Sequence, residues 1–339
     1  MNSAIAQSPT SVLVVANRAN AQSVTLANYY MSKRHIPATN LLLVSWTAAD
    51  NADQCSPTEY QNYFATPIWK LLNISPGIDY VVICRNLPSK VRDPATSVVF
   101  SLDSALTRNR TTQAVNPYYT KTTAFHNSSN AGMRLVTRLD GWSWADATAL
   151  VDRSILAKRA GNFYLDEDIK KGYTGAYGMV NTAMRDAYYT LLGMGGGLTP
   201  KIDETTGFYA PAVPVMGYYS WGSNDSGYYL AGGEHGAFAQ IKFVNGGIAE
   251  TVVSTSGQWI RYVPNVSHQS QVSQLIAQGA TGVKGYVAEP YTAAVAQPVL
   301  LFTNYTMGRN LAESYYSASV YVGWKDVVIG DPLCSPFGL

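Results

Sequence analysis

The chain contains few charged residues, and its charges nearly cancel. Only 14% of its 339 residues are Asp, Glu, Lys or Arg, and 24 basic side chains face 22 acidic ones, which leaves a formal net charge of +2. Such a chain lacks the broad positive field that attracts nucleic acid or anionic lipid. Its apolar runs all fall short of the ~20 residues that a membrane-spanning helix needs. We therefore expect no nucleic-acid partner and no membrane span.

Cysteine is also scarce. Cys55, Cys84 and Cys334 form an odd set without a CxxC spacing, so neither a zinc site nor a disulfide framework is indicated. The sequence is also compatible with one disulfide bridge and one free thiol. Cys84 ends an apolar run and is interpreted as a small buried hydrophobe. Cys334 follows Gly-Asp-Pro near the C-terminus and is a poor candidate nucleophile.

What the chain does have is enough apolar residues for a large core. With 47% hydrophobic residues, residues 11–339 are expected to form a single large α/β domain, with possible subdomains at 11–130 and 131–339. Ala4-Ile5-Ala6 matches a signal-peptidase site, so residues 1–10 are interpreted as a signal-peptide remnant or tail. Together with the neutral, tyrosine-rich composition (24 Tyr), this predicts a secreted protein.

Apolar runs alternate with helical patterns along the sequence. Strands are predicted at 11–16, 41–46, 80–84, 134–139, 162–165, 214–220, 248–254 and 282–288, and helices at 22–34, 57–72, 102–107, 144–159, 176–192 and 269–277. Unbroken Val/Ile/Leu strands separated by helices indicate a parallel sheet covered on both faces. We therefore predict a three-layer α/β fold with a mostly parallel central sheet. Residues 86–130, rich in Pro, Ser, Thr and Asn, are expected to run mainly over the surface.

Polar and aromatic residues follow three of the predicted strands, and ligands of parallel sheets bind beyond the carboxyl ends of strands. The three strand ends should therefore meet at one crevice. We expect its ligand-contacting residues to be Trp221, Ser223, Asn224, Asp225, Ser254, Glu289 and Tyr291.

The order of these features carries a resemblance to a known family. A strand with an X-Gly-Ser turn, a strand with a small-residue loop, a further strand and helix, and the closing Gly330-Asp331-Pro332-Leu333 resemble the caspase-like core of the gingipain-type cysteine peptidases, over roughly the last third of the chain. In that family the turn carries a His-Gly pair and the second strand ends at the nucleophilic Cys. Here Trp221-Gly222 and the loop 254–256 occupy these positions. The resemblance implies a caspase-like C-terminal half that lacks the Cys-His dyad.

A second resemblance spans most of the chain. The segments 135–141 (LVTRLDG) and 312–316 (AESYY), the pair Gly285-Tyr286 followed by 289–291 (EPY), and the closing GDPL are similar to an uncharacterised family of secreted bacterial proteins. That family brings no activity that could be transferred.

The missing imidazole shapes the functional hypotheses. A thiol near its free pKa needs a neighbouring base to become a thiolate, and the indole of Trp221 cannot accept a proton. Our first hypothesis is a secreted non-peptidase binding or surface-associated protein that holds a peptide, a glycan or a protein partner. An alternative is a hydrolase with Ser254 or Ser256 as nucleophile and, as base, His235 or a Glu289 kept neutral by aromatic neighbours, although no G-x-S-x-G elbow is present.

A third hypothesis is an extracellular protein that self-assembles through neutral, tyrosine-rich faces. The tyrosine pairs 218–219, 228–229 and 315–316, with Trp221 and Trp259, also fit the binding hypothesis. Aromatic residues supply rigid amphipathic surface of the kind found at recognition sites. One tyrosine of such a pair on a strand can equally be core while the other is exposed, because side chains alternate between the two faces of a sheet.

The carboxylates suggest one more hypothesis, a metal site. Asp225, Glu289 and Asp331 could gather at the crevice with Asp103 or Asp140, but no D-x-D-x-D-G loop appears, so no metal site and no cofactor are expected. Asp331, before a proline, is expected to tie a turn. Asp140 is expected to form a structural ion pair with Arg138.

Overall fold

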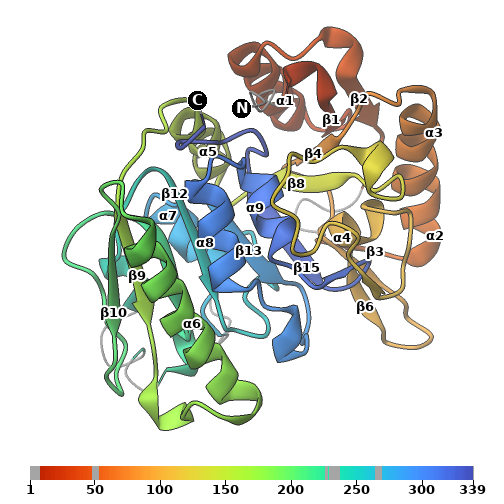
Figure 1. Ribbon diagram of the computed structural model, residues 1–339. Helices are drawn as coiled ribbons and strands as arrows, with labels where there is room; N and C mark the ends of the chain where they lie inside the picture. Colours follow the sequence, from red (N-terminus) through yellow and green to blue (C-terminus); the bar gives the residue numbers. More distant parts are fainter. Residues whose placement is uncertain (1–7, 48–52, 226–227, 229–236, 264–268, 339) are drawn as a thin grey trace.

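A ten-stranded sheet forms the centre of the molecule (Figure 1). The computed structural model describes residues 8–47, 53–225, 228, 237–263 and 269–338. The strands lie in the order β10 (Thr199–Asp203), β9 (Asn162–Asp166), β11 (Val215–Ser220), β12 (Phe243–Thr251), β13 (Gly282–Tyr286), β15 (Asp326–Gly330), β8 (Leu135–Leu139), β4 (Tyr80–Cys84), β1 (Val12–Asn17) and β2 (Leu41–Val44). The five strands β10, β9, β11, β12 and β13 are parallel to one another. Strands β8, β4, β1 and β2 are also parallel to one another, whereas β15 runs antiparallel to β13.

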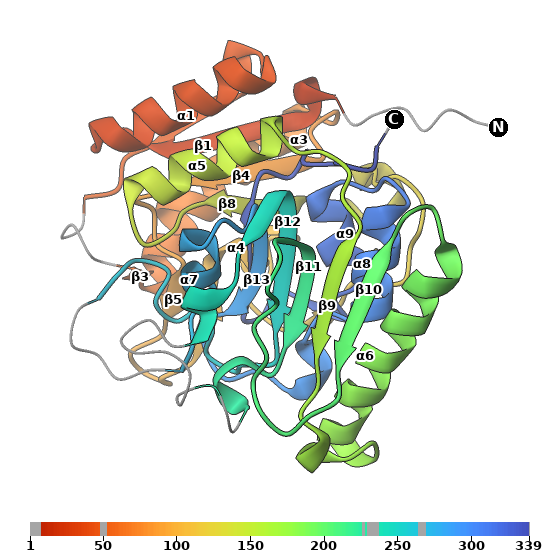
Figure 2. The same cartoon turned by 90° about the vertical axis from the view of Figure 1, so that its left-hand side faces the viewer.

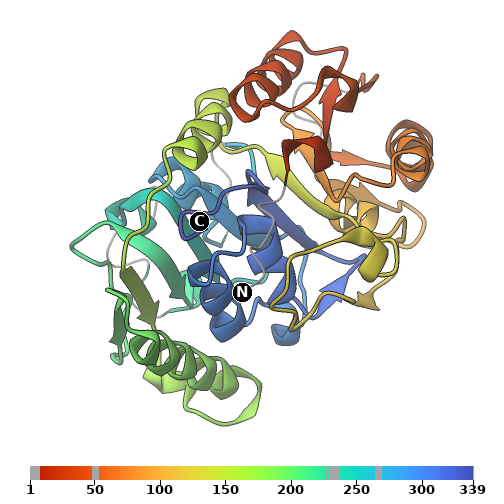
Figure 3. The same ribbon diagram turned by 45° about the horizontal axis from the view of Figure 1, so that its top comes forward.

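Helices cover both faces of this sheet (Figures 2 and 3). The larger helices are α1 (Ala21–Arg34), α3 (Thr66–Ile74), α5 (Trp144–Ile155), α6 (Gly175–Met194), α7 (Val272–Ala277), α8 (Pro298–Thr306) and α9 (Leu311–Ser317). Strand β1 shows why there are three layers. Its residues alternate between two cores: Val12 and Val14 pack in the cluster that includes Tyr30 of α1, whereas Leu13 and Val15 pack in the cluster of α3, as the two-residue period of a strand requires. The predicted three-layer α/β fold is confirmed.

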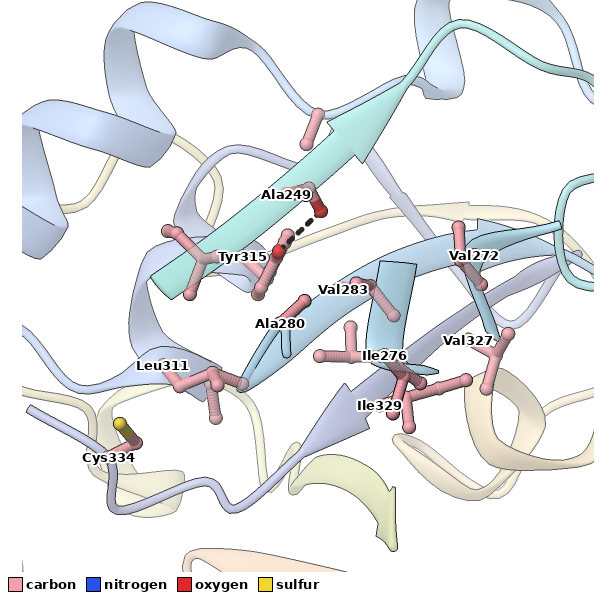
Figure 4. Packing of buried hydrophobic residues seen from close by; sticks show 14 of the residues in the cluster. Ala249, Val272, Ile276, Ala280, Val283, Leu311, Tyr315, Val327, Ile329 and Cys334 are labelled. Carbon is pink, nitrogen blue, oxygen red and sulfur yellow. Dashed lines mark hydrogen bonds between the residues drawn. The ribbon is translucent and has the colours of Figure 1, made fainter. Parts of the chain in front are cut away.

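Two glycines of β13 let helices α9 and α7 approach the sheet closely. A Cβ on Gly282 would lie 2.2 Å from Leu311 of α9, and one on Gly285 would lie 2.9 Å from Val272 of α7. The two glycines are three residues apart on β13, so these helices lie on opposite faces. Helix α9 is also fixed by a buried phenol, because Tyr315 Oη donates to the carbonyl oxygen of Ala249 (2.7 Å; Figure 4) and to that of Gly282 (3.1 Å).

Most predicted elements are found within a few residues of their expected ends. The Ser56 capping box is present, but the helix that it opens contains a π-helical stretch, Tyr60–Ala65, between α2 (Pro57–Glu59) and α3. The segment 86–130 is more ordered than expected, since it holds α4 (Leu102–Leu106) and two strands, β5 (Lys90–Arg92) and β6 (Val99–Ser101), of a small sheet with β3 (Gln54–Cys55). Edge strand β10, the antiparallel strand β15 and helices α8 and α9 were not predicted. Among the described residues no helix could span a membrane.

A buried ion network joins distant segments beside β8. The fully buried Arg138 makes two bonds to Asp103 of α4 (Nε 2.8 Å, Nη2 2.6 Å) and one to Asp140 (3.2 Å). Asp140 also accepts from Arg85 (2.6 Å) and from Arg261 (3.1 Å), which belongs to the loop after β12. The expected Arg138–Asp140 ion pair is therefore confirmed. It belongs to a larger network that ties α4, β4, β8 and the loop after β12 together.

Asp331 lies far from the expected crevice. Its carboxylate accepts from Tyr30 Oη (2.8 Å) and Arg34 Nε (2.6 Å) at the end of α1, and from Ser154 Oγ (2.7 Å). It also accepts from the backbone N–H of Leu333 (3.0 Å), so the predicted turn-tying role is confirmed. Because β15 is antiparallel to β13, its end points to the opposite edge of the sheet. The possibility that Asp331 joins the crevice carboxylates is therefore wrong.

The Arg138 network makes a testable contribution to stability. In Arg138→Gln, Asp103 and Asp140 lose a buried cation, so we expect the free energy of unfolding to fall by about 3–5 kcal/mol, the usual effect of removing one partner of a buried ion pair. The matched variant Arg92→Gln alters an exposed side chain and should change it by no more than about 0.5 kcal/mol. Urea denaturation followed by circular dichroism measures both. Equal midpoints for the two variants would contradict the proposed role.

Candidate functional site

A cavity of about 360 Å³ lies beyond the carboxyl ends of β11, β12 and β13. Its walls come from these strand ends, from α6 with the turn before it, and from the segment after β13. The lining residues are Lys171, Tyr177, Trp221, Asn224, Val252, Val253, Ser254, Gln269, Glu289, Pro290, Tyr291, Thr292 and Val295. The structure thus brings Trp221, Asn224, Ser254, Glu289 and Tyr291 to one cavity.

Trp221 forms the inner wall. It is only 1% exposed, and its indole Nε1–H donates to Asn181 Oδ1 on α6 (2.8 Å). The Tyr177 ring meets the indole edge to face at 5.9 Å between centroids, and Lys171 Nζ lies 4.7 Å from the ring centre. The indole is therefore a fixed part of the wall, and its hydrogen-bonding group is already used.

Lys171 connects two strand ends across the cavity. Its ammonium lies 3.3 Å from Asp168 and donates to the backbone oxygen of Asn224 (2.9 Å). The Asn224 side chain in turn donates to the Val252 carbonyl (2.7 Å). The sequence analysis did not select Lys171. The signal that could have found it is the acidic run 166–168 directly after a strand, because it places carboxylates at the same sheet edge.

Ser254 hydrogen-bonds to an amide instead of a base. Its hydroxyl donates to Gln269 Oε1 (3.0 Å), which also accepts from the Thr255 hydroxyl (2.7 Å) and backbone N–H (3.2 Å). A carboxamide oxygen does not take up a proton at neutral pH, so this contact orients the serine without activating it. The sequence analysis did not select Gln269. It stands in the segment before α7, with no local pattern that marks it.

Glu289 and Tyr291 form the outer rim. Tyr291 is 67% exposed and its ring lies against Trp324, with centroids 5.2 Å apart. Glu289 is exposed, and the described residues place no hydrogen-bond donor or cation against its carboxylate. Tyr286 is buried and bonds to Glu250 instead. The expected enclosure of Glu289 by aromatic neighbours is therefore wrong, because this side chain is exposed.

Three of the predicted residues lie outside the cavity lining. Ser223 joins the turn after β11 to the segment before α7, because its hydroxyl accepts from the Ser270 N–H (2.9 Å) and its N–H donates to Ser270 Oγ (3.1 Å). Ser256 is fully buried, which removes it as an accessible nucleophile. Asp225 is 3% exposed. His235 falls outside the described residues.

Asp225 lies near a second carboxyl, that of Asp166 at the end of β9. Burial, together with the charge of Asp225, raises the pKa of Asp166 well above its usual value. Tyr209 N–H and Tyr218 Oη donate to Asp166 at 3.3 and 3.4 Å. Neither acid lines the cavity. Nowhere in the described ranges do three His, Cys, Asp or Glu side chains group in a way that could hold a metal ion.

The three thiols are buried away from the cavity. Cys55, Cys84 and Cys334 are all free, so the open possibility of one disulfide is not realised in this structure. Burial raises the pKa of Cys55 to about 12 and that of Cys334 to about 11, and it raises the pKa of Cys84 as well. All three are thiols at neutral pH and are absent from the cavity lining.

The tyrosine pairs also differ from the expectation. Tyr218, Tyr219, Tyr315 and Tyr316 are at most 2% exposed, because each packs between the sheet and a helix or bonds to a backbone carbonyl. Tyr228 is buried too, and its neighbour at position 229 falls outside the described residues. The described members of these pairs therefore supply core packing, and they offer no surface for self-assembly.

A buried charged cluster lies beneath the cavity. Glu250 and Lys284, on the adjacent strands β12 and β13, are both fully buried. Tyr286 Oη donates to Glu250 Oε1 (3.1 Å), and Lys284 Nζ donates to the Ala294 carbonyl (2.8 Å). The second oxygen of Glu250 has no hydrogen-bond partner among the described residues. Burial raises the pKa of Glu250 to about 8, although Lys284 and Tyr286 act in the opposite direction.

The comparisons with known proteins identify the fold. The structure is similar to the complex of Porphyromonas gingivalis RgpB pro- and mature domains, with a TM-score of 0.50 and 11% identity, covering 96% of this chain and 79% of that chain. A second structure, described as a protease, gives a TM-score of 0.49 and 10% identity over 97% and 78% of the two chains. No family model and no curated protein matches. The chain thus has the gingipain-type, caspase-like α/β fold, and the likeness extends over nearly its whole length, well beyond the last third.

Glu250 gives stability a pH dependence of defined sign. The folded protein keeps a proton on Glu250 up to about pH 8, whereas the unfolded chain releases it near 4.5. Stability should therefore fall as the pH rises between these values, by on the order of a few kcal/mol. Glu250→Gln is neutral at every pH and should flatten this part of the profile. Urea denaturation at pH 5, 6, 7 and 8 measures it.

The control for this experiment is Glu289→Gln, which alters an exposed carboxylate and should keep the slope of the unmodified protein. If Glu250→Gln also keeps that slope, the buried acid does not carry the effect.

Proposed function

We propose that this protein is a secreted binding protein without peptidase activity, and that it holds a peptide, a glycan or a protein partner in the cavity at the ends of β11, β12 and β13. The observation that carries the proposal is the hydrogen bond from Ser254 to the Gln269 carboxamide (3.0 Å). Ser254 lies in the loop where the resemblance implies a nucleophilic cysteine. At this position the chain has a hydroxyl that faces an amide oxygen.

The turn after β11 supports the same proposal. The resemblance implies a histidine where Trp221 stands, and an indole N–H only donates. Here that N–H is bonded to Asn181. The two described imidazoles, His35 and His126, belong to the end of α1 and to the loop before β8. A proton acceptor for Ser254 is therefore lacking among the described histidines.

The cavity wall supports binding. It offers amide and hydroxyl groups from Asn224, Gln269 and Ser254 beside the aromatic rings of Tyr177 and Tyr291. Ligand sites in proteins combine apolar and aromatic walls with a few placed polar groups in this way. Secretion is proposed from the Ala4-Ile5-Ala6 motif and the near-neutral composition.

A fluorophosphonate probe tests for a serine nucleophile. We expect no covalent adduct by intact-mass spectrometry, because Ser254 bonds to an amide oxygen and has no base against it among the described residues, and because Ser256 is buried. A serine hydrolase of known activity is the positive control. A stoichiometric adduct that disappears in Ser254→Ala would instead establish the hydrolase alternative.

Binding at the cavity is tested by changing Tyr291, on its exposed rim. The labelled protein is applied to peptide and glycan arrays, and Tyr291→Ala should weaken the binding of its ligand about tenfold, as expected for the loss of an aromatic contact worth about 1.4 kcal/mol. Tyr63→Ala, which removes another exposed ring from the N-terminal half, is the matched control and should bind normally. Equal binding by both variants would reject this cavity as the ligand site.

A further inference from the structure

A second cavity adjoins the first. It has a volume of about 420 Å³ and lies between α6 and the start of α8, two helices that run side by side (Figure 1). Thr292 and Val295 line both cavities. The segment between these residues, which begins with one 3₁₀ turn, Thr292–Ala294, therefore contributes to the walls of both cavities. Below, this segment is called the ridge.

The lining of the second cavity differs chemically from that of the first. Its side chains are mainly aliphatic, with one carboxylate, that of Asp186. The residues are Ala176, Met179, Val180, Thr182, Ala183, Asp186, Tyr219, Thr292, Ala293, Val295, Gln297, Pro298 and Val299. Met179 is 59% exposed although it is apolar. A wall of this kind suits an aliphatic group, which gains by leaving water, and it offers few partners to the many hydroxyls of a sugar.

The ridge is held in place from below. The Ala294 carbonyl accepts from Lys284 Nζ (2.8 Å) and Tyr286 Oη (3.2 Å), both of which are fully buried. Within the ridge, Ala294 N–H donates to the Tyr291 carbonyl (2.9 Å) and Val295 N–H to the Thr292 carbonyl (3.2 Å). Two cavities with a fixed wall between them are preorganised, so a ligand that fills both does not have to order the wall.

We propose that the ligand is an extended peptide that crosses the ridge and places an aliphatic side chain (Leu, Ile, Val or Met) in the second cavity while another of its side chains occupies the first. This inference rests on the proposed binding function and names its ligand class. In an extended chain, side chains on the same face recur every second residue, about 7 Å apart, and adjoining pockets for alternate side chains are a common way to recognise peptides.

The carboxylates of the two cavities predict that acidic side chains of a ligand are excluded from them. Asp186 lines the second cavity and Glu289 the first, and neither carboxylate has an ion-pair partner among the described residues. Lys171, the one cation that the described residues contribute to the lining of the first cavity, is paired with Asp168. An acidic side chain in either cavity would meet a like charge at short range. The ligand should therefore carry no Asp or Glu at these two positions.

The experiment uses an array of extended peptides with every residue type at each position, read with the full protein. The unmodified protein should select an aliphatic residue at one position and reject Asp and Glu both there and two residues away. Ala183→Trp fills the second cavity from α6 and should weaken binding of the selected peptide at least tenfold and abolish the aliphatic preference. Ala145→Trp, at an exposed position on α5, is the matched control and should behave as the unmodified protein.

A second variant guards against misfolding. Ala176→Trp enters the same cavity from an exposed position in the first turn of α6, and circular dichroism verifies that each variant is folded. If folded Ala183→Trp and Ala176→Trp bind the selected peptide as the unmodified protein does, the second cavity is not a subsite and the inference is wrong.

The other outcomes separate this inference from the function on which it rests. Binding to glycans alone, sensitive to Tyr291→Ala, would overturn the peptide ligand but keep the binding function. Peptide binding that is insensitive to Tyr291→Ala and to both tryptophan variants would overturn both, and so would the absence of any ligand on either array.

Discussion

The buried guanidinium of Arg138 is the constraint on which the candidate site depends. Removing such a cation from water is costly unless it is paired and fully hydrogen-bonded, and here Asp103 and Asp140 supply the pairing while the carbonyl oxygens of Leu87 and Pro88 accept the remaining bonds. Asp140 in turn holds Arg261, in the loop that starts at the cavity wall with residues 252–254. The network therefore fixes the middle of the loop 252–271, seven residues after Ser254.

The chain retains a peptidase-like scaffold but uses its strand ends for structural bonds. Trp221 forms the inner wall of the cavity, and its indole N–H donates to Asn181. Ser223 bonds to Ser270, and Ser254 to Gln269. Each of these contacts joins one strand end to a neighbouring segment, so the cavity is held open by hydrogen bonds between its own walls. Such an arrangement favours a preformed site over one assembled by its ligand.

The sequence allowed the fold to be predicted better than the site. Unbroken apolar runs show strands and helices locally, and parallel strands bring their carboxyl ends together, which is why Trp221, Ser254 and Tyr291 were placed correctly in one cavity. The misplaced residue Asp331 follows a strand whose antiparallel direction no local pattern reveals. Lys171 and Gln269 reach the cavity from segments about 50 and 15 residues from Trp221 and Ser254 in the chain, and such contacts depend on tertiary packing that single-sequence patterns do not report.

The buried pair of Glu250 and Lys284 has an energetic cost that packing alone does not explain. Burying an ammonium group and a carboxylic acid away from water costs free energy unless their hydrogen bonds are made, and one oxygen of Glu250 lacks a partner among the described residues. The polar cluster fixes the orientation of a backbone group. Lys284 and Tyr286 both donate to the carbonyl of Ala294, whereas apolar contacts would not hold that carbonyl in one orientation. Since Ala294 lies in the ridge between the two cavities, its carbonyl links the polar core to the walls of both cavities. The polar cluster of Glu250, Lys284 and Tyr286 is thus understandable as the support that fixes the ridge between the two cavities.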